Sequence, residues 1–209
     1  MAPAMMLAKN TELVALATSD IEKAKAFKSL QPALQIYDGY DALLTDANVD
    51  AVYIPLPNHL HVEWVKRAVA AGKHVLCEKP IAMRSAEIDE LIQLRDLSGR
   101  FVAEAYMIVH HPQWQYAKHL VDSGAIGAVQ QIDTVFSYNN ASDVDNIRNR
   151  SETGGGGLRD IGVYTLGAAR YIMDAEFDEL QHVDVQLEKG VDVWAGVSAR
   201  FGDVRFHGI

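Results

Sequence analysis

Short apolar runs alternate with helical patterns through the first half of the chain. The runs rich in β-forming residues are Glu12–Thr18, Gln35–Tyr37, Ala51–Leu56, His74–Cys77 and Phe101–Tyr106. Helices are expected to follow the N-cap residues Ser19 (with Glu22 in capping-box position) and Asn58, and a further helix is expected to begin at Ser85. Strands that alternate with helices form parallel β-α-β units, so the pattern predicts an α/β fold with a doubly wound, Rossmann-type parallel sheet.

The pattern changes after about Tyr106. A helix is predicted at Pro112–Ser123, a long strand at Ala128–Tyr138, a polar loop at Asn139–Thr153 and a helix at about Leu158–Met173. Strand-like runs then follow at Leu180–Glu188, Val191–Phe201 and Val204–Phe206. Their connections are tight, which indicates antiparallel pairing. We therefore predict two domains, residues 1–105 and an α+β domain of residues 106–209 with an open, mostly antiparallel sheet.

Composition and charge narrow the possible partners. The net charge is −9 and no run of Lys or Arg is present, which argues against nucleic acid as a partner. No apolar run is long enough to cross a membrane, so no membrane partner is expected. The single cysteine, Cys77, lies in an apolar strand and cannot form an internal disulfide. We interpret it as a packed thiol in a reducing, cytoplasmic compartment.

The stretch Ala71–Pro80 carries the first candidate chemistry. A short apolar strand ends there in Glu78, Lys79 and Pro80. Ligands of open α/β sheets bind at the carboxyl ends of the strands, so a carboxylate and an amine at this edge indicate a reaction site. The alternative is a surface ion pair followed by a turn proline.

A second candidate group lies in the other half of the chain. Asp160 and Tyr164 are four residues apart and therefore share one face of the predicted helix. The glycine run Gly154–Gly157 would let the backbone approach a ligand near the start of that helix. A phenol beside an ammonium group can be tuned for proton transfer. The alternative makes Tyr164 a half-buried aromatic and Asp160 an exposed acid.

The spacing of the histidines does not predict a metal centre. The chain contains His59, His61, His110 and His111, but no cysteine or carboxylate pattern accompanies them at ligand spacing. We therefore predict no metal site. Asn58 and His61 follow the carboxyl end of a strand and are candidates to line a bound cofactor.

Five motifs occur in an order and spacing that resemble a known family. They are AVYIPLPNHLHVEWVKRAVAAGKHVLCEKPIAM, AEAYMIVHHPQW, SGAIG, DNIRNR and GGGGLRDIGVYTLGAARYI. Together they resemble the Gfo/Idh/MocA oxidoreductases, which include glucose–fructose oxidoreductase. Tyr164 stands where inositol dehydrogenase-like members have His, so the chain is most similar to the dihydrodiol and xylose dehydrogenase branch.

The resemblance implies an NAD(P)-binding domain followed by a domain whose sheet often makes the oligomer contact. It implies hydride transfer between a nicotinamide and a carbinol or carbonyl carbon of a sugar, polyol or cyclic diol. Lys79 matches the family's EKP lysine, and Asp160 and Tyr164 match the helix that carries the partner acid. We hypothesise that Tyr164 transfers the proton, that Lys79 lowers its pKa and holds the substrate oxygen, and that Asp160 orients both. Arg148 is a further candidate for substrate binding.

The cofactor is expected to be NADP or NAD. Residues assigned to its binding are Thr18, Ser19, Lys23, Leu56, Asn58, His61, Glu78 and Lys79. Thr18 and Ser19 with Lys23 could receive a ribose 2′-phosphate, which favours NADP. Asp20, beside them, would instead favour the free 2′-hydroxyl of NAD.

The chain departs from the family pattern at both ends. The family begins with a strand and a GxGxxG turn, neither of which occurs here, so roughly 20 residues are expected to be absent before Met1. That strand lies in mid-sheet, and its absence leaves unpaired backbone groups unless the sheet closes up. Strands are also expected beyond Ile209. The alternative function is therefore a non-catalytic, truncated relative that binds a sugar or a partner protein.

Overall fold

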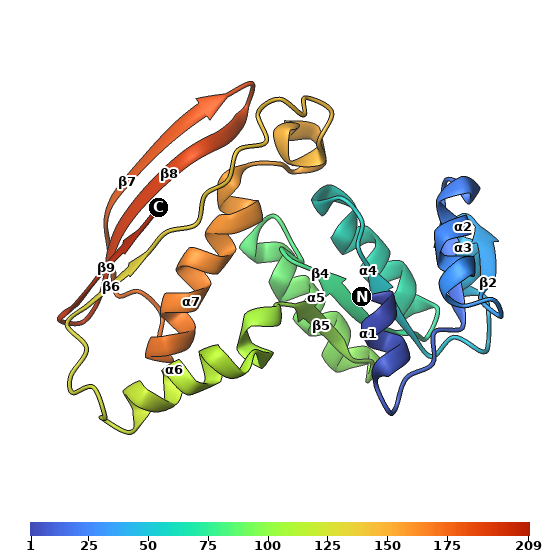
Figure 1. The fold of residues 1–209 in the computed structure, drawn as a ribbon, viewed down its shortest axis with the longest axis horizontal. Coiled ribbons are helices and arrows are strands. Elements are labelled where there is room, and N and C mark those ends of the chain that lie inside the picture. Colours follow the sequence, from blue (N-terminus) through green and yellow to red (C-terminus); the bar gives the residue numbers. More distant parts are fainter. The chain divides into compact units, whose positions relative to one another are not determined.

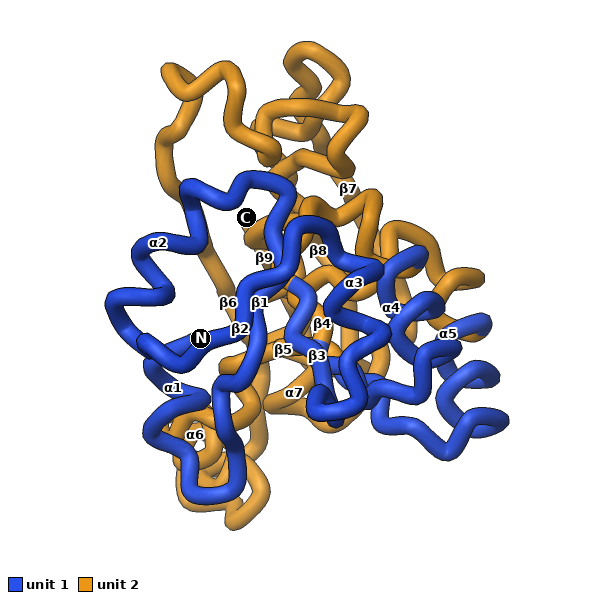
Figure 2. The backbone as a smooth tube through the Cα atoms, turned by 90° about the vertical axis from the view of Figure 1, so that its right-hand side faces the viewer, with its two compact units in different colours: residues 1–54, 63–76, 90–103 blue, residues 55–62, 77–89, 104–209 orange.

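The computed structural model describes residues 1–209, which form two compact units. The first unit comprises residues 1–54, 63–76 and 90–103, and the second comprises residues 55–62, 77–89 and 104–209 (Figure 2). Each unit therefore collects segments that are separate in the sequence. The predicted domain boundary between residues 105 and 106 remains a prediction.

Strands and helices alternate through the first half of the chain, as predicted (Figure 1). In order, the elements are α1 (Ala2–Leu7), β1 (Ala15–Thr18), α2 (Ile21–Leu30), β2 (Gln35–Asp38), α3 (Tyr40–Leu44), β3 (Ala51–Ile54), α4 (His61–Ala70), β4 (His74–Glu78), α5 (Ser85–Ser98) and β5 (Val102–Ala105). Strands β1 and β2 pair in parallel from Ala15↔Gln35 to Thr18↔Asp38. The α/β class is thereby confirmed.

The five strands of this half form two sheets rather than one. One sheet contains β1 and β2, and the other has the order β3-β4-β5. No strand pairs with both β1 and β3, so the sheet has not closed up where the family's first strand was expected to lie. Both strands consequently keep an edge without strand partners, which is costly for backbone N–H and C=O groups.

Helix α4 packs the apolar core of this half. Its residues Val65, Ala68 and Val69 are at most 5% exposed. They recur at a spacing of three and four residues, which places them on one face of the helix. The opposite face carries Arg67, which forms an ion pair with Asp41.

Two predicted N-caps are wrong. Helix α2 is capped by Asp20 rather than Ser19, because the Asp20 carboxylate accepts a hydrogen bond of 3.1 Å from the backbone N–H of Glu22. Asn58 belongs to a 3-10 turn before α4 and caps nothing. Its side-chain amide donates instead to the carbonyl of Gly154, at 2.9 Å.

The second half forms a four-stranded mixed sheet with helices. Its main elements are α6 (Pro112–Asp122), β6 (Gln131–Thr134), a π-helical turn (Leu158–Gly162), α7 (Val163–Met173), β7 (Glu179–Glu188), β8 (Val191–Phe201) and β9 (Val204–Gly208). The sheet order is β6-β9-β8-β7. The β7–β8 and β8–β9 pairs are antiparallel and the β6–β9 pair is parallel, so the prediction of a mostly antiparallel sheet is confirmed.

The predicted strand Ala128–Tyr138 is too long. Strand β6 covers only Gln131–Thr134, in register with Arg205–Gly208 of β9, and one further backbone hydrogen bond of 2.9 Å joins the Phe136 N–H to the Ile209 carbonyl. Beyond Phe136 the chain leads toward the loop that precedes α7 (Figure 1). The shorter strand therefore frees Tyr138 from sheet pairing and makes it available to the site described below.

Aromatic side chains form the core between α7 and this sheet. Phe206 is fully buried, Phe201 is 5% exposed, and both pack with Ala169 of α7. The Phe177 ring lies 4.4 Å from the Phe201 ring and 4.9 Å from the Phe206 ring, measured between centroids. This packing fixes α7, and with it the residues at its start. None of the helices is both long enough and apolar enough to span a bilayer.

Candidate active site

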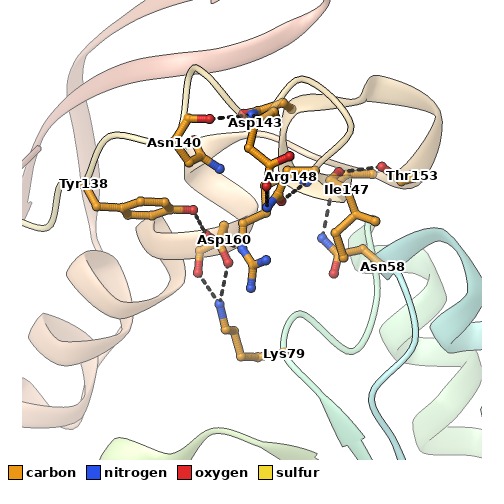
Figure 3. Close-up of polar contacts among 12 residues, drawn as sticks. Asn58, Lys79, Tyr138, Asn140, Asp143, Ile147, Arg148, Thr153 and Asp160 are labelled. Atoms are coloured by element: carbon orange, nitrogen blue, oxygen red, sulfur yellow. Dashed lines mark hydrogen bonds and ion pairs between the residues drawn. The ribbon is translucent and has the colours of Figure 1, made fainter. Parts of the chain in front are cut away.

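Lys79 and Asp160 form the centre of the site. Lys79 follows the last residue of β4, and Asp160 lies in the π-helical turn before α7, 81 residues later. The Lys79 ammonium donates to the Asp160 backbone carbonyl and lies 3.1 Å from Asp160 Oδ1 (Figure 3). The two side chains are only 12% and 14% exposed. A charge-assisted pair shielded to this degree holds its geometry firmly.

The second carboxylate oxygen of Asp160 is also occupied. It accepts a hydrogen bond of 2.5 Å from the Tyr138 hydroxyl and one of 2.9 Å from Arg148 Nε (Figure 3). Burial alone would raise the pKa of Asp160, but the hydrogen bonds from Tyr138, Lys79 and Arg148 outweigh it and lower that pKa. Asp160 therefore remains an anion, and its chemistry is to orient its three donors.

Tyr164 completes the predicted trio. The Lys79 ammonium lies 4.8 Å from the centroid of the Tyr164 ring, an arrangement in which cation and ring attract each other. On other sides the ring contacts Tyr106, stacked at 5.7 Å between centroids, and Phe136, also at 5.7 Å. The structure thus brings together all three residues that were predicted to be catalytic.

The expected lowering of the Tyr164 pKa by Lys79 is wrong in this structure. Burial raises the pKa of Tyr164, and the negative charges of Glu78, Asp160 and Glu104 raise it further. The Lys79 ammonium bonds to Asp160 and contacts the phenol through its ring. Tyr164 is therefore protonated at neutral pH, which suits a proton donor better than a base.

The glycine run permits close packing within the chain at Gly154 and Gly155, while Gly156 and Gly157 line the pocket described below. A Cβ on Gly155 would lie 2.7 Å from the backbone carbonyl carbon of Arg148, and one on Gly154 would lie 3.0 Å from the Cβ of Asn58. The N–H of Leu158, at the start of the π-helical turn, already donates to the Asp192 carboxylate at 2.5 Å. This helix start therefore has an internal cap, and the approach of a ligand to the glycine run remains a prediction.

A pocket of about 200 Å³ opens beside Asp160. Its lining includes Tyr138, Arg148 and Asp160 together with three asparagines, Asn139, Asn140 and Asn149. Burial lowers the pKa of Arg148, but its hydrogen bond to Asp160 and the nearby negative charge raise the pKa by more, so the guanidinium stays charged. Arg148 was predicted to bind substrate, and it lies in the wall of this pocket.

His61 and Leu56 help to fix the EKP turn. The His61 side chain is fully buried, with one ring nitrogen 2.7 Å from the Pro80 carbonyl and the other 2.6 Å from the Leu56 carbonyl. The ring therefore connects the segment after β3 to the turn that carries Lys79. With Asn58 bonded to Gly154, two of the predicted cofactor residues hold neighbouring segments in place. Their contact with a cofactor remains a prediction.

Glu78 and Lys79 lie at the carboxyl end of β4, whereas three other predicted cofactor residues belong to the first unit, with Thr18 and Ser19 at the carboxyl end of β1 and Lys23 in the first turn of α2. The Thr18 hydroxyl donates to the Asp20 carbonyl at 3.0 Å and accepts from the Asp20 N–H at 3.1 Å. Lys23 lies 4.0 Å from the Asp20 carboxylate, and its side chain is 77% exposed. Ser19 is also exposed.

Sequence reasoning missed Tyr138 and Asn140. They belong to the polar run Ser137–Asn140 after β6, which was divided between a strand and a loop. A polar run directly after an apolar strand was the available signal. Tyr138 and Asp160 are 22 positions apart in the sequence, and nothing in that spacing indicates that their side chains form a hydrogen bond.

Cys77 is buried, and the histidines form no metal-binding group. Cys77 is fully buried, and burial raises its pKa to about 12, with smaller contributions from Glu104 and Glu78. It is a packed thiol, as interpreted from the sequence. No group of three or more His, Cys, Asp and Glu side chains is arranged to hold a metal ion.

Comparison with protein families gives two matches. Residues 1–106 match the "Oxidoreductase family, NAD-binding Rossmann fold", and residues 114–207 match the "GFO/IDH/MocA C-terminal domain". The two matches follow the order of the two parts predicted from the sequence. They cover both halves of the candidate site.

Known relatives and solved structures agree with these matches. An uncharacterized oxidoreductase of Rhizobium meliloti is 47% identical over 91% of this chain and 57% of its own length. A dTDP-3,4-didehydro-2,6-dideoxy-alpha-D-glucose 3-reductase of Streptomyces violaceoruber is 42% identical over 97% and 58%. A 3-ketoreductase of Actinomadura kijaniata, solved with NADP and TDP-benzene, is 32% identical with a TM-score of 0.89, over 99% of this chain and 63% of that one.

The chain thus spans less than two thirds of the length of the proteins it resembles. The A. kijaniata enzyme has also been solved with a lysine-to-alanine and with a tyrosine-to-phenylalanine substitution, in complex with the same two ligands. The motifs around Lys79, Asp160 and Tyr164, the fold and the family matches all lead to one assignment. The chain belongs to the Gfo/Idh/MocA oxidoreductase family.

Proposed function

We propose that this protein is an NAD(P)-dependent oxidoreductase that moves a hydride between a nicotinamide and a carbinol or carbonyl carbon of a sugar, polyol or cyclic diol. The observation that carries the proposal is the assembly of Lys79, Asp160 and Tyr164 after the carboxyl end of β4. Within the substrate class, the sugar 3-reductases among its relatives favour a ketosugar.

The chain's own residues fit a dinucleotide at the strand ends where Rossmann folds bind one. The exposed Ser19 and Lys23 at the end of β1 can receive a 2′-phosphate, while the Asp20 carboxylate is engaged as the cap of α2. This supports NADP over NAD, as does the NADP in the A. kijaniata structure. When bound, the nicotinamide supplies or accepts the hydride.

Lys79 and Asp160 hold the oxygen that reacts. The ammonium has three N–H groups, two of which are engaged by Asp160, so one remains for a substrate oxygen. Asp160 keeps its charge and fixes the direction of that donor. A positioned ammonium of this kind stabilises the negative charge that develops on a carbonyl oxygen as it is reduced.

Tyr164 supplies the proton in the direction of reduction. Its raised pKa keeps the phenol protonated at neutral pH, so its Oη can donate to the oxygen that becomes a hydroxyl. In the direction of oxidation the same oxygen takes the proton back. Tyr164 and Lys79 thereby both serve as substrate-binding residues, with Arg148 in the adjoining pocket wall.

The experiment that tests the proposal combines binding and turnover. Purified protein is titrated with NADPH and NADH by nicotinamide fluorescence, and NADPH oxidation is then followed with a panel of ketosugars. We expect Lys79→Ala and Tyr164→Phe to lower kcat/KM at least ~100-fold. A matched control pair is Lys118→Ala and Tyr171→Phe, since Lys118 lies 5.9 Å from the ring of Tyr171 in another part of the same half of the chain.

The alternative, a non-catalytic sugar- or partner-binding relative, is favoured by the division of the parallel strands into two sheets. It predicts that the protein binds a sugar but neither NADPH nor NADH. Binding of neither nucleotide, together with no turnover, would contradict the oxidoreductase proposal. An equal loss of kcat/KM in the two control variants would contradict a specific role of Lys79 and Tyr164 in catalysis.

We further propose a homo-oligomer that forms through the second sheet. All ten residues of β7 are exposed, among them Val183 and Val185, which point to one face of the strand. Light scattering should show an oligomer that Val185→Lys dissociates, whereas a monomeric wild type would exclude it.

We also propose a cytoplasmic location, supported by the reduced Cys77 and testable by cell fractionation.

A further inference from the structure

The side-chain nitrogen of Asn140 is a buried donor without a partner. Only two side-chain polar atoms in the protein are buried and lack a hydrogen bond, Asn140 Nδ2 and the Thr134 hydroxyl. Thr134 lies within β6, outside the lining of the pocket beside Asp160, whereas Asn140 forms part of that lining. Native proteins satisfy nearly all such groups with protein or water partners, so an exception in a pocket wall marks a position where a molecule in the pocket can accept a hydrogen bond.

The Asn140 amide points toward the residues of the candidate site. In Figure 3 its side-chain nitrogen is directed toward the space between Tyr138 and Arg148, above Asp160. These three residues line the same pocket of about 200 Å³. A ligand oxygen in this pocket could therefore contact the Asn140 amide while another part of the same ligand lies beside Asp160.

The backbone of Asn140 is held in place by its own loop. The Asn140 carbonyl accepts hydrogen bonds of 3.0 Å from the Asp143 N–H and of 3.0 Å from the Asn149 side chain. Asn149 also donates to the Asp143 carbonyl at 2.8 Å, which closes the loop on itself. The donor is therefore preorganised, so a ligand would not have to pay for ordering it.

The charges around the pocket favour a neutral ligand. The two cations in the lining, Arg148 and Lys189, are accompanied by three carboxylates, Asp160, Glu188 and Asp192. The lining thus has no positive excess that would select a phosphate. Side-chain amides both donate and accept, which matches the hydroxyl and ether oxygens of a carbohydrate, and the volume suits one sugar ring.

We infer that Asn140 is a specificity-determining residue whose amide donates a hydrogen bond to one hydroxyl or ring oxygen of a neutral monosaccharide unit in this pocket. The inference rests on the proposed function and adds to it the residue that selects the sugar. Asn140 acts on recognition, while Lys79 and Tyr164 act on the reacting oxygen.

The test measures sugar binding directly, by ligand-observed NMR and calorimetry on the full chain, with and without NADP⁺. The probes are methyl glycosides of glucose, galactose and xylose and their monodeoxy analogues. Asn140→Leu keeps the approximate volume of the side chain and removes the amide. The matched control is Asn139→Ser, because Asn139 lines the same pocket but its side-chain oxygen accepts from the Ala141 N–H, a bond that a serine hydroxyl can retain.

We expect Asn140→Leu to weaken binding of the preferred glycoside about tenfold, as loss of one hydrogen bond does, and Asn139→Ser to leave it unchanged. One monodeoxy analogue should bind the wild type as weakly as the parent glycoside binds Asn140→Leu. The affinity of that analogue should not fall further in Asn140→Leu. The melting temperature of Asn140→Leu should not fall, since an unpaired buried donor has been removed.

The inference is overturned if no glycoside binds the wild type, if Asn140→Leu binds as the wild type does, or if both variants lose affinity equally. If one of these results is found but the protein still binds NADPH and reduces ketosugars, the proposed function remains supported and only the role of Asn140 is rejected. If the protein binds glycosides in an Asn140-dependent way but binds no nucleotide, the sugar site is supported and the oxidoreductase proposal is contradicted.

Discussion

The hydrogen bond from Tyr138 to Asp160 provides a prediction that can be worked from the structure. Tyr138→Phe removes the hydroxyl that lies 2.5 Å from Asp160 Oδ2 and keeps the ring. A hydrogen bond to a charged group contributes about 1.5–3 kcal/mol, and because Tyr138 is 49% exposed, solvent reduces this to about 1 kcal/mol. Arg148 and Lys79 continue to hold the carboxylate, so the fold should survive.

The sign of the effect follows from the lowered pKa of Asp160. A carboxyl group with a lowered folded-state pKa contributes stability above its unfolded pKa, and loses it as the pH falls through the folded value. Tyr138→Phe should therefore raise the Asp160 pKa and lower the free energy of unfolding by about 1 kcal/mol at pH 7. At a pH below the folded-state pKa of Asp160, where the carboxyl group is protonated in both states, the difference should shrink to less than half.

Urea unfolding of wild type and variant at both pH values measures this difference, and an NMR titration of the Asp160 carboxyl carbon measures the pKa. Tyr116→Phe is the control, since Tyr116 is 63% exposed and lies away from Asp160 on α6. A loss of stability that is the same at both pH values would refute the electrostatic reasoning. No loss at pH 7 would mean that the hydroxyl does not hold the carboxylate.

Three further predictions concern the same half of the chain. Lys79→Met should lower the free energy of unfolding by about 2–4 kcal/mol at pH 7, measured by urea unfolding, because it leaves Asp160 with one fewer buried partner; an unchanged value would contradict the ion pair. Cys77, with its pKa raised to about 12, should not react with Ellman's reagent at pH 8 until the protein unfolds, and rapid reaction of the folded protein would contradict its burial. Gly155→Ala should cost about 2 kcal/mol or more in chemical denaturation, since its Cβ would lie 2.7 Å from the Arg148 backbone, whereas Ala141→Ser in the same loop should cost little.

Elements with strong local signals were predictable from the sequence. Strands β7 and β8 are β-rich runs separated by Lys189-Gly190, where both residues have positive φ, and their bounds agree with the prediction to within one residue. The length of β6 was not predictable, because it depends on the register with β9 rather than on its own residues. The Asn58 cap failed for the same reason, since its amide bonds to Gly154, 96 residues away.

The candidate site likewise has parts that local sequence patterns predict and parts that depend on contacts between distant residues. The strand before Lys79 and the helix face shared by Asp160 and Tyr164 are local patterns, and the family motifs linked them across the chain. The direction of the Tyr164 pKa shift required the burial of the ring and the positions of three carboxylates, which no motif contains. Tyr138 and Asn140 lie in a loop whose course follows from side-chain hydrogen bonds, so only coordinates reveal their partners.

The separation of β1 and β2 from the other parallel strands affects how cooperatively the protein unfolds. A two-stranded sheet of four residue pairs is marginally stable by itself, and every residue of β1 is only partly buried. Its amide hydrogens should therefore exchange with solvent through local openings, before those of β4, whose Val75 and Cys77 are almost fully buried. Thr18, Ser19 and Lys23 belong to this loosely held segment. A nucleotide that binds there would have to order it, so the affinity for the cofactor and the protection of β1 from exchange should rise together.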